Sequence, residues 1–220
     1  MKNKLRLMYI GVTFISVLCI VFAFVLAKDF LMEFGLTQQQ PSQDTQVENN
    51  VILYKEPKNP TELQKQIYEE LLEATKAFPE EYDPFVVADC VVRSFVADFF
   101  TWTNKEGNFD VGGLDYVYGP NHLAFALYAR DTFYQNFNFF EQEYGVENLI
   151  EVESIRTVVD YAAPVVIDEV EYPAYYVRVY WTYKENNVID VTQFQDEAYY
   201  IAFYNQKIGR FELAETYQVN

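Results

Sequence analysis

The chain has 220 residues, a formal net charge of −17 and 50% hydrophobic residues, so its folded part is too apolar to be disordered and can bury one core. Residues 35–220 hold 12 Lys and Arg against 31 Asp and Glu, a net charge of −19. A field of that sign repels phosphates and anionic lipid headgroups, which argues against direct nucleic-acid binding.

An uncharged stretch from Met8 to Ala27 follows three basic residues, namely Lys2, Lys4 and Arg6. At ~1.5 Å per residue, a helix over this stretch is about 30 Å long, the thickness of a bilayer core. Because positive charge prefers the cytoplasmic side, we predict a cytoplasmic tip at residues 1–7 and one transmembrane helix at 8–27. The alternative is a signal peptide cleaved after Ala27, which would release a secreted protein. The stretch exceeds the ~7–15 apolar residues typical of such peptides.

A polar segment separates this predicted anchor from the rest of the chain. Residues 37–50 are rich in Gln and nearly free of large apolar side chains, so we predict a linker over 28–58. The remaining residues, 59–220, form the predicted extracytoplasmic domain.

Three helices are predicted at the start of this domain. The first begins with Asn59 as N-cap and Pro60 at the first helical position, and the second begins at Asp83-Pro84 and runs to about Thr103. The third spans Asn121–Glu143 and ends at Gly145. Apolar positions three or four apart give the expected inward faces, which are Leu63, Ile67, Leu71 and Ala74, then Val87, Val91, Phe95, Phe99 and Trp102, then Leu123, Leu127, Tyr134 and Phe137.

After Gly145 the period changes to two, and Val, Ile, Tyr, Phe and Thr dominate, as in β-strands. We predict strands at 149–161, 174–184, 198–205 and 210–219. Alternation over 174–184 puts Tyr175 on one face and Tyr176, Arg178 and Tyr180 on the other. The order indicates an α+β fold in which three helices pack on one face of a curved antiparallel sheet.

This order of elements resembles the NTF2-like cone fold. The resemblance rests on the strand pairs AYYVRVYWTYKEN and EAYYIAFYNQKIGRFELAETYQV, and it covers about 60–219. With the predicted anchor and linker, the layout is similar to VirB8/TcpC-type subunits of bacterial conjugation and type IV secretion machines. That resemblance implies a non-enzymatic scaffold, and TcpC-type proteins often carry two such domains where this chain has room for one.

The alternative is a small-molecule site or an isomerase- or dehydratase-type enzyme inside the cone. Asp98 and the single histidine, His122, are candidates for an acid–base dyad. The simpler interpretation makes His122 a partly solvated helix-start residue and Asp98 a boundary residue that pairs with Arg93 or Arg130. No nucleophile motif or phosphate loop is present, and we predict no metal and no cofactor.

The strand aromatics also have two interpretations. They line both faces of a curved sheet, or part of one face is a docking surface, since Tyr and Trp are enriched at interfaces. The binding residues we predict are Tyr176, Arg178, Tyr180 and Tyr200. The expected partners are other membrane or cell-envelope proteins, including a second copy of the chain. The function expected first is therefore a membrane-anchored interaction subunit of a cell-envelope assembly.

Overall fold

The structure, a computed structural model, describes residues 54–167 and 169–218, with side chains described up to Ala214. The predicted cytoplasmic tip, the transmembrane helix at 8–27 and nearly all of the linker at 28–58 lie outside the described residues. Within the described part of the chain, no helix combines the length and the apolar composition needed to cross a membrane.

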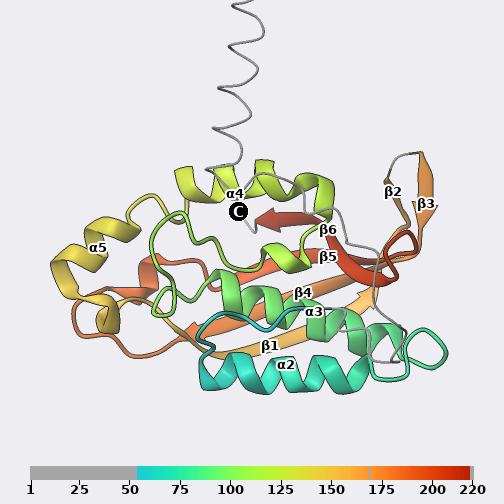
Figure 1. Cartoon of the computed structure of the whole chain (residues 1–220), viewed down its shortest axis with the longest axis horizontal. Coiled ribbons are helices and arrows are strands. Elements are labelled where there is room, and N and C mark those ends of the chain that lie inside the picture. The colour runs from blue at the N-terminus through green and yellow to red at the C-terminus, as the bar shows by residue number, and fades with distance from the viewer. Residues whose placement is uncertain (1–53, 168, 219–220) are drawn as a thin grey trace, which may run out of the picture. The chain divides into compact units, whose positions relative to one another are not determined.

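The described chain has an α+β fold in which the helices precede an antiparallel sheet, as predicted (Figure 1). The helices are α2 (Glu62–Ala74), α3 (Pro84–Phe99), α4 (His122–Asp131) and α5 (Phe137–Tyr144). The strands are β1 (Val152–Tyr161), β2 (Val165–Ile167), β3 (Val170–Tyr172), β4 (Ala174–Tyr183), β5 (Glu197–Asn205) and β6 (Arg210–Gln218).

The main sheet has the order β1-β4-β5-β6 with all neighbours antiparallel, which confirms the predicted meander. Gly209 closes the β5–β6 hairpin with a φ of +70°, a conformation that favours glycine. The short hairpin of β2 and β3 was not predicted. Each of its strands has only three residues, too few for the alternation of side chains to stand out, and Figure 1 shows the hairpin projecting from the end of the sheet.

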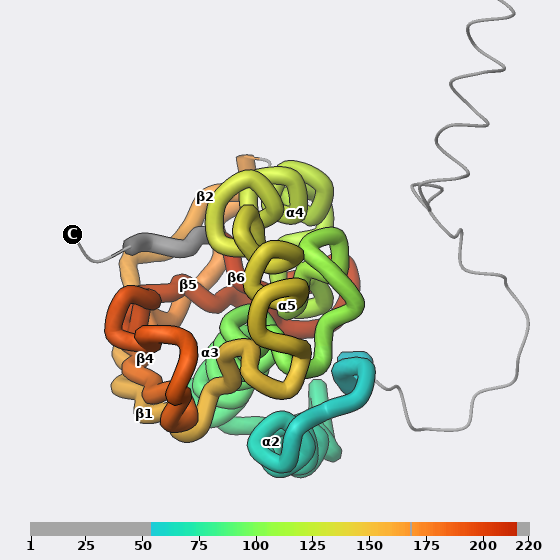
Figure 2. The backbone as a smooth tube through the Cα atoms, turned by 90° about the vertical axis from the view of Figure 1, so that its left-hand side faces the viewer, coloured from blue at the N-terminus to red at the C-terminus, as the bar shows by residue number. Residues whose placement is uncertain are grey.

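The helices lie on one side of the main sheet (Figure 2). The second predicted helix, α3, is the central one, and it begins as predicted because the Asp83 side chain accepts a hydrogen bond from the backbone N–H of Phe85. Its predicted inward residues Val87, Val91 and Phe95 are buried. The helix ends at Phe99, before the predicted end, and Trp102 beyond it is still buried in the same core.

The first predicted helix begins later than expected. Thr61 caps α2 by accepting a hydrogen bond from the N–H of Gln64, while the Gln64 side chain accepts one from the N–H of Thr61. This reciprocal capping box fixes the start at Glu62, and Asn59 instead has a left-handed φ of +45°. The prediction of Asn59 as the cap was therefore wrong.

The third predicted helix is two helices, α4 and α5, separated by a turn at 132–136. The turn brings Tyr134 into the core, where its hydroxyl donates to the carbonyl of Phe99 at 2.6 Å and accepts from the N–H of Gly112 at 3.2 Å. The break also changes which face of α4 is inward. Leu123 and Leu127, predicted to be inward, are 52% and 48% exposed, whereas Tyr134 and Phe137 are buried as predicted.

Candidate functional site

The face of the sheet opposite the helices carries three of the four predicted binding residues. Along β4 the side chains alternate as predicted, so that Tyr175, Val177 and Val179 are buried while Tyr176, Arg178 and Tyr180 are half-buried on the other face. The register places Tyr199 of β5 opposite Arg178 and Arg156 of β1 opposite Tyr180. We call Arg156, Tyr176, Arg178, Tyr180 and Tyr199 the outer patch.

Stacking between guanidinium groups and phenol rings organises the outer patch. The Cζ atoms of Arg156 and Arg178 each lie 4.8 Å from the ring centroid of Tyr180, and that of Arg178 also lies 5.2 Å from the centroid of Tyr199. The rings of Tyr176 and Tyr199 stack with centroids 5.1 Å apart. These contacts hold flexible side chains in place before any partner arrives, which lowers the entropic cost of binding.

The two arginines of the outer patch differ in their partners. Arg178 Nε donates a hydrogen bond to Glu197 Oε1 at 2.6 Å, and this contact raises the pKa of the guanidinium. Arg156 contacts the Tyr180 ring, and no carboxylate of the described residues pairs with it. Among the described residues, the outer patch therefore has one positive charge that no carboxylate balances.

The fourth predicted binding residue, Tyr200, lies on the other face of the sheet. Its side chain is 3% exposed and belongs to the core that faces the helices. Since neighbouring residues of a strand point to opposite faces, Tyr199 and Tyr200 cannot serve one surface. The structure therefore separates Tyr200 from the outer patch.

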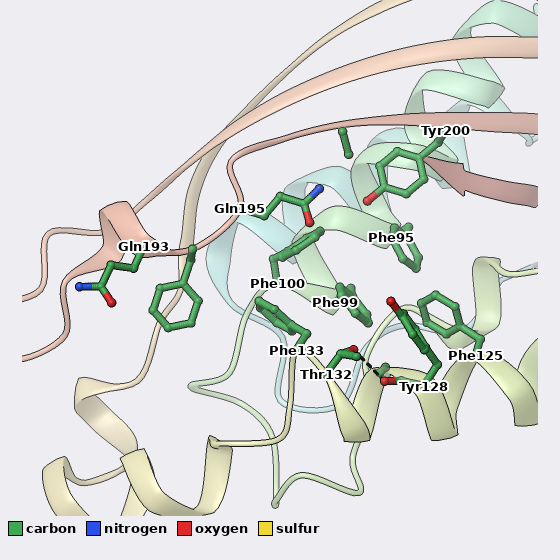
Figure 3. Close-up of a pocket in the computed structure, with 13 residues that line it drawn as sticks. Phe95, Phe99, Phe100, Phe125, Tyr128, Thr132, Phe133, Gln193, Gln195 and Tyr200 are labelled. Atoms are coloured by element: carbon green, nitrogen blue, oxygen red, sulfur yellow. Dashed lines mark hydrogen bonds between the residues drawn. The ribbon is translucent and has the colours of Figure 1, made fainter. Parts of the chain in front are cut away.

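Tyr200 lines a cavity of about 320 Å³ between the helices and the sheet (Figure 3). The walls come from α3, α4, the turn after α4, the segment before β5, and β5 itself. They are formed by Phe95, Phe99, Phe100, Phe125, Tyr128, Ala129, Thr132, Phe133, Gln193, Phe194, Gln195, Ala198 and Tyr200. The alternative prediction of a small-molecule site inside the cone named none of these residues except Tyr200, because no single helix or strand supplies the lining. The only signal was the abundance of Phe in segments that the fold brings together.

The structure does not assemble the candidate dyad of Asp98 and His122. Asp98 Oδ1 accepts a hydrogen bond from Lys105 Nζ at 2.5 Å, and Oδ2 accepts one from the N–H of Gly113 at 2.6 Å. His122 Nε2 lies 2.7 Å from the carbonyl oxygen of Val117. Each side chain is occupied by a different structural contact, and neither lines the cavity.

The alternative pairing of Asp98 with Arg93 or Arg130 was also wrong, since Lys105 takes that place. Arg93 instead pairs with Glu70 at 2.6 Å and with Asp89 at 2.8 Å. Within the described residues, no group of three or more His, Cys, Asp or Glu side chains is placed to hold a metal ion.

Comparisons with known proteins found no significant match to this chain. No protein-family model matches the chain, and neither a curated protein nor a solved structure gives a significant match. The outer patch and the cavity are therefore the features of the described residues that bear on function.

Proposed function

We propose that this chain is an interaction subunit of a cell-envelope assembly, of the conjugation or type IV secretion kind. In this proposal the N-terminus is cytoplasmic, residues 8–27 anchor the chain in the membrane as its single span, and an NTF2-like domain binds other envelope proteins outside the cytoplasm. The observation that carries the proposal is the outer patch, a preorganised surface of Tyr and Arg on a sheet face without a helix layer.

The composition of the outer patch supports a protein partner. Tyr and Arg are the residues that dominate binding energy at protein interfaces, where they cluster near the centre of the contact. The Tyr180 ring contacts two guanidinium groups, and the patch therefore offers both apolar area and directed charge. The order of helices followed by an antiparallel meander supports the NTF2-like part of the proposal, because that fold has the same succession of layers.

A second candidate function, binding of a small molecule inside the domain, is favoured by the cavity of about 320 Å³. Cavities that bind small ligands range from about 300 to 1,000 Å³ and are mostly apolar. Its lining residues include no His, Asp, Glu, Lys or Arg. Tyr200 is the buried acid–base candidate that the lining does contain, and burial raises its pKa, so that it keeps its proton and cannot act as a base. The cavity therefore supports binding rather than an isomerase or dehydratase reaction.

Site-specific photocrosslinking in membranes of the source organism tests the first proposal. The photoreactive residue p-benzoylphenylalanine replaces Tyr180 in the outer patch or, as a control, the exposed Glu69 on the opposite helix layer. We expect Tyr180 to crosslink to a defined envelope protein or to a second copy of the chain, and Glu69 not to do so. Arg156→Glu, at an exposed position with no carboxylate partner among the described residues, should reduce that crosslink with little effect on the thermal unfolding midpoint. If neither position gives a crosslink and the chain is recovered only as a monomer, the result would contradict the proposal.

A further inference from the structure

The Tyr200 hydroxyl faces the cavity and has no hydrogen-bond partner among the described residues. Its residue is 3% exposed, and no hydrogen bond joins the hydroxyl to another described residue. Figure 3 shows the oxygen directed toward the middle of the ring of cavity residues. Burial raises the pKa of this phenol, which keeps it protonated and able to donate a hydrogen bond. Because a hydrogen-bond donor in a mostly apolar pocket fixes the orientation of a ligand, this hydroxyl indicates where a ligand oxygen would lie.

The walls of the cavity select against charge. Around Tyr200 they are mostly phenylalanine rings, such as Phe95, Phe99, Phe125 and Phe133, and no charged side chain lines the space. An ionised group moved from water into such surroundings loses its hydration and finds no countercharge in the lining, which makes its transfer strongly unfavourable. A carboxylate, sulfate or ammonium group is therefore excluded, whereas a hydroxyl or carbonyl group can pair with Tyr200.

The volume limits the size of the ligand. A water-sized group occupies about 30 Å³ in a liquid, so that 320 Å³ accommodates a body of about ten non-hydrogen atoms. A route of entry is present, since Tyr128 is 64% exposed and Thr132 and Gln193 are also exposed where they line the cavity. The opening thus lies between the end of α4 and the segment that precedes β5.

The geometry points to a binding site for a small uncharged molecule that has an apolar body of about ten non-hydrogen atoms and one hydroxyl or carbonyl group. This inference rests on the second candidate function and names its ligand class. Tyr200 is the specificity-determining residue, because it supplies the only phenol that is fully buried in the lining, and the phenylalanine rings supply the apolar contact area.

Two matched photoreactive probes test the ligand class on the full chain in lipid nanodiscs. Both are chains of about eight carbons with a diazirine at the same carbon, a body of about ten non-hydrogen atoms, and one ends in an alcohol while the other ends in a carboxylate. After irradiation, mass spectrometry quantifies labelling of cavity residues. We expect the alcohol to label them and the carboxylate not to do so.

Three variants complete the test. Tyr200→Phe removes only the hydroxyl and should lower alcohol labelling about fivefold, the equivalent of one hydrogen bond of about 1 kcal/mol. Thr132→Trp fills the opening from an exposed position and should abolish labelling. Tyr176→Phe, in the outer patch, is the matched control and should change nothing. Thermal unfolding verifies that each variant is folded. If Thr132→Trp does not fold, the comparison of Tyr200→Phe with the natural chain still decides the test.

The possible outcomes distinguish failure of the proposed ligand class from failure of the proposal that the cavity binds small molecules. Equal labelling by both probes, with no effect of Tyr200→Phe, would overturn the ligand class while the cavity still bound small molecules. Labelling that avoids the cavity, or that Thr132→Trp leaves unchanged, would overturn both. Neither result bears on the crosslinks from Tyr180, which test the interaction proposal separately.

Discussion

Lys105 Nζ lies 2.5 Å from Oδ1 of Asp98, although the two side chains are only 5% and 15% exposed. The other oxygen of Asp98 accepts a hydrogen bond from the N–H of Gly113. Asp98 thus ties α3 to the glycine-containing loop that follows it. A carboxylate with both oxygens committed in this way is a structural residue, which explains why it takes no part in either candidate site.

Replacing Lys105 should destabilise the domain strongly. Lys105→Met leaves the Asp98 carboxylate largely buried without its countercharge, a change that costs about 3 kcal/mol or more. Urea unfolding measures the loss, and Lys65→Met, which removes an exposed lysine paired with Glu62, serves as control and should leave the midpoint unchanged. In the double variant with Asp98→Asn, part of the stability should return. Equal midpoints for Lys105→Met and the natural chain would show that the pair contributes nothing.

The backbone at Gly113, whose N–H donates to Asp98, should also be sensitive to substitution. Gly113 has a φ of +75°, and a Cβ atom there would lie 2.7 Å from the Phe95 ring. Gly113→Ala should therefore cost about 2 kcal/mol or more in the free energy of unfolding. Gly119→Ala is the matched control, because nothing lies within 4 Å of its Cβ position, and it should change stability by about 0.5 kcal/mol or less. Similar losses at both positions would refute this explanation.

The sequence predicted correctly those features that depend on residues close together in the chain, namely a helix cap and the two faces of a strand. The cap at Asp83 depends on residues two positions apart, and the division of β4 into Tyr175 and Tyr176 faces follows from the alternation of a strand. The third helix was predicted as one because residues 121–143 contain no Gly or Pro. What breaks it is a contact with Phe99, 35 positions away from Tyr134, and no periodicity within the segment records such a contact.

In the candidate sites, too, the sequence predicted what one strand carries and missed what depends on distant segments. Three residues of the outer patch were predicted because one strand carries them, and their stacking on Arg156 and Tyr199 required the register of neighbouring strands. The cavity needed the positions of side chains from distant segments. Its central residue, Tyr200, was selected from the sequence in one group with Tyr176 and Tyr180, although it lies on the other face of the sheet, because β5 has aromatic residues at adjacent positions.

The hydroxyl of Tyr134 should account for a measurable share of the stability. Tyr134→Phe leaves the carbonyl of Phe99 and the N–H of Gly112 without this partner, at an expected cost of about 2 kcal/mol. Tyr161→Phe removes a hydroxyl from a residue that is 69% exposed, and the same urea titration should show no loss for that variant. If the two substitutions cost the same, the buried hydroxyl does not hold the turn after α4 in place.

The Cys90 thiol should make stability fall in alkaline solution. Burial raises the pKa of this thiol in the folded chain to about 11, above the ~8.5 of an exposed thiol. Between these two pH values the unfolded chain has lost the proton while the folded chain keeps it, so unfolding releases a proton and stability decreases as the pH rises. Urea unfolding at pH 8 and at pH 10 measures the decrease, in a Cys19→Ser background that leaves a single thiol. Cys90→Ala should lose less stability over that interval, because the tyrosines, which also titrate, are the same in both chains. In the folded chain at pH 8, iodoacetamide should modify Cys90 far more slowly than in urea, whereas equal rates would place this thiol in contact with solvent.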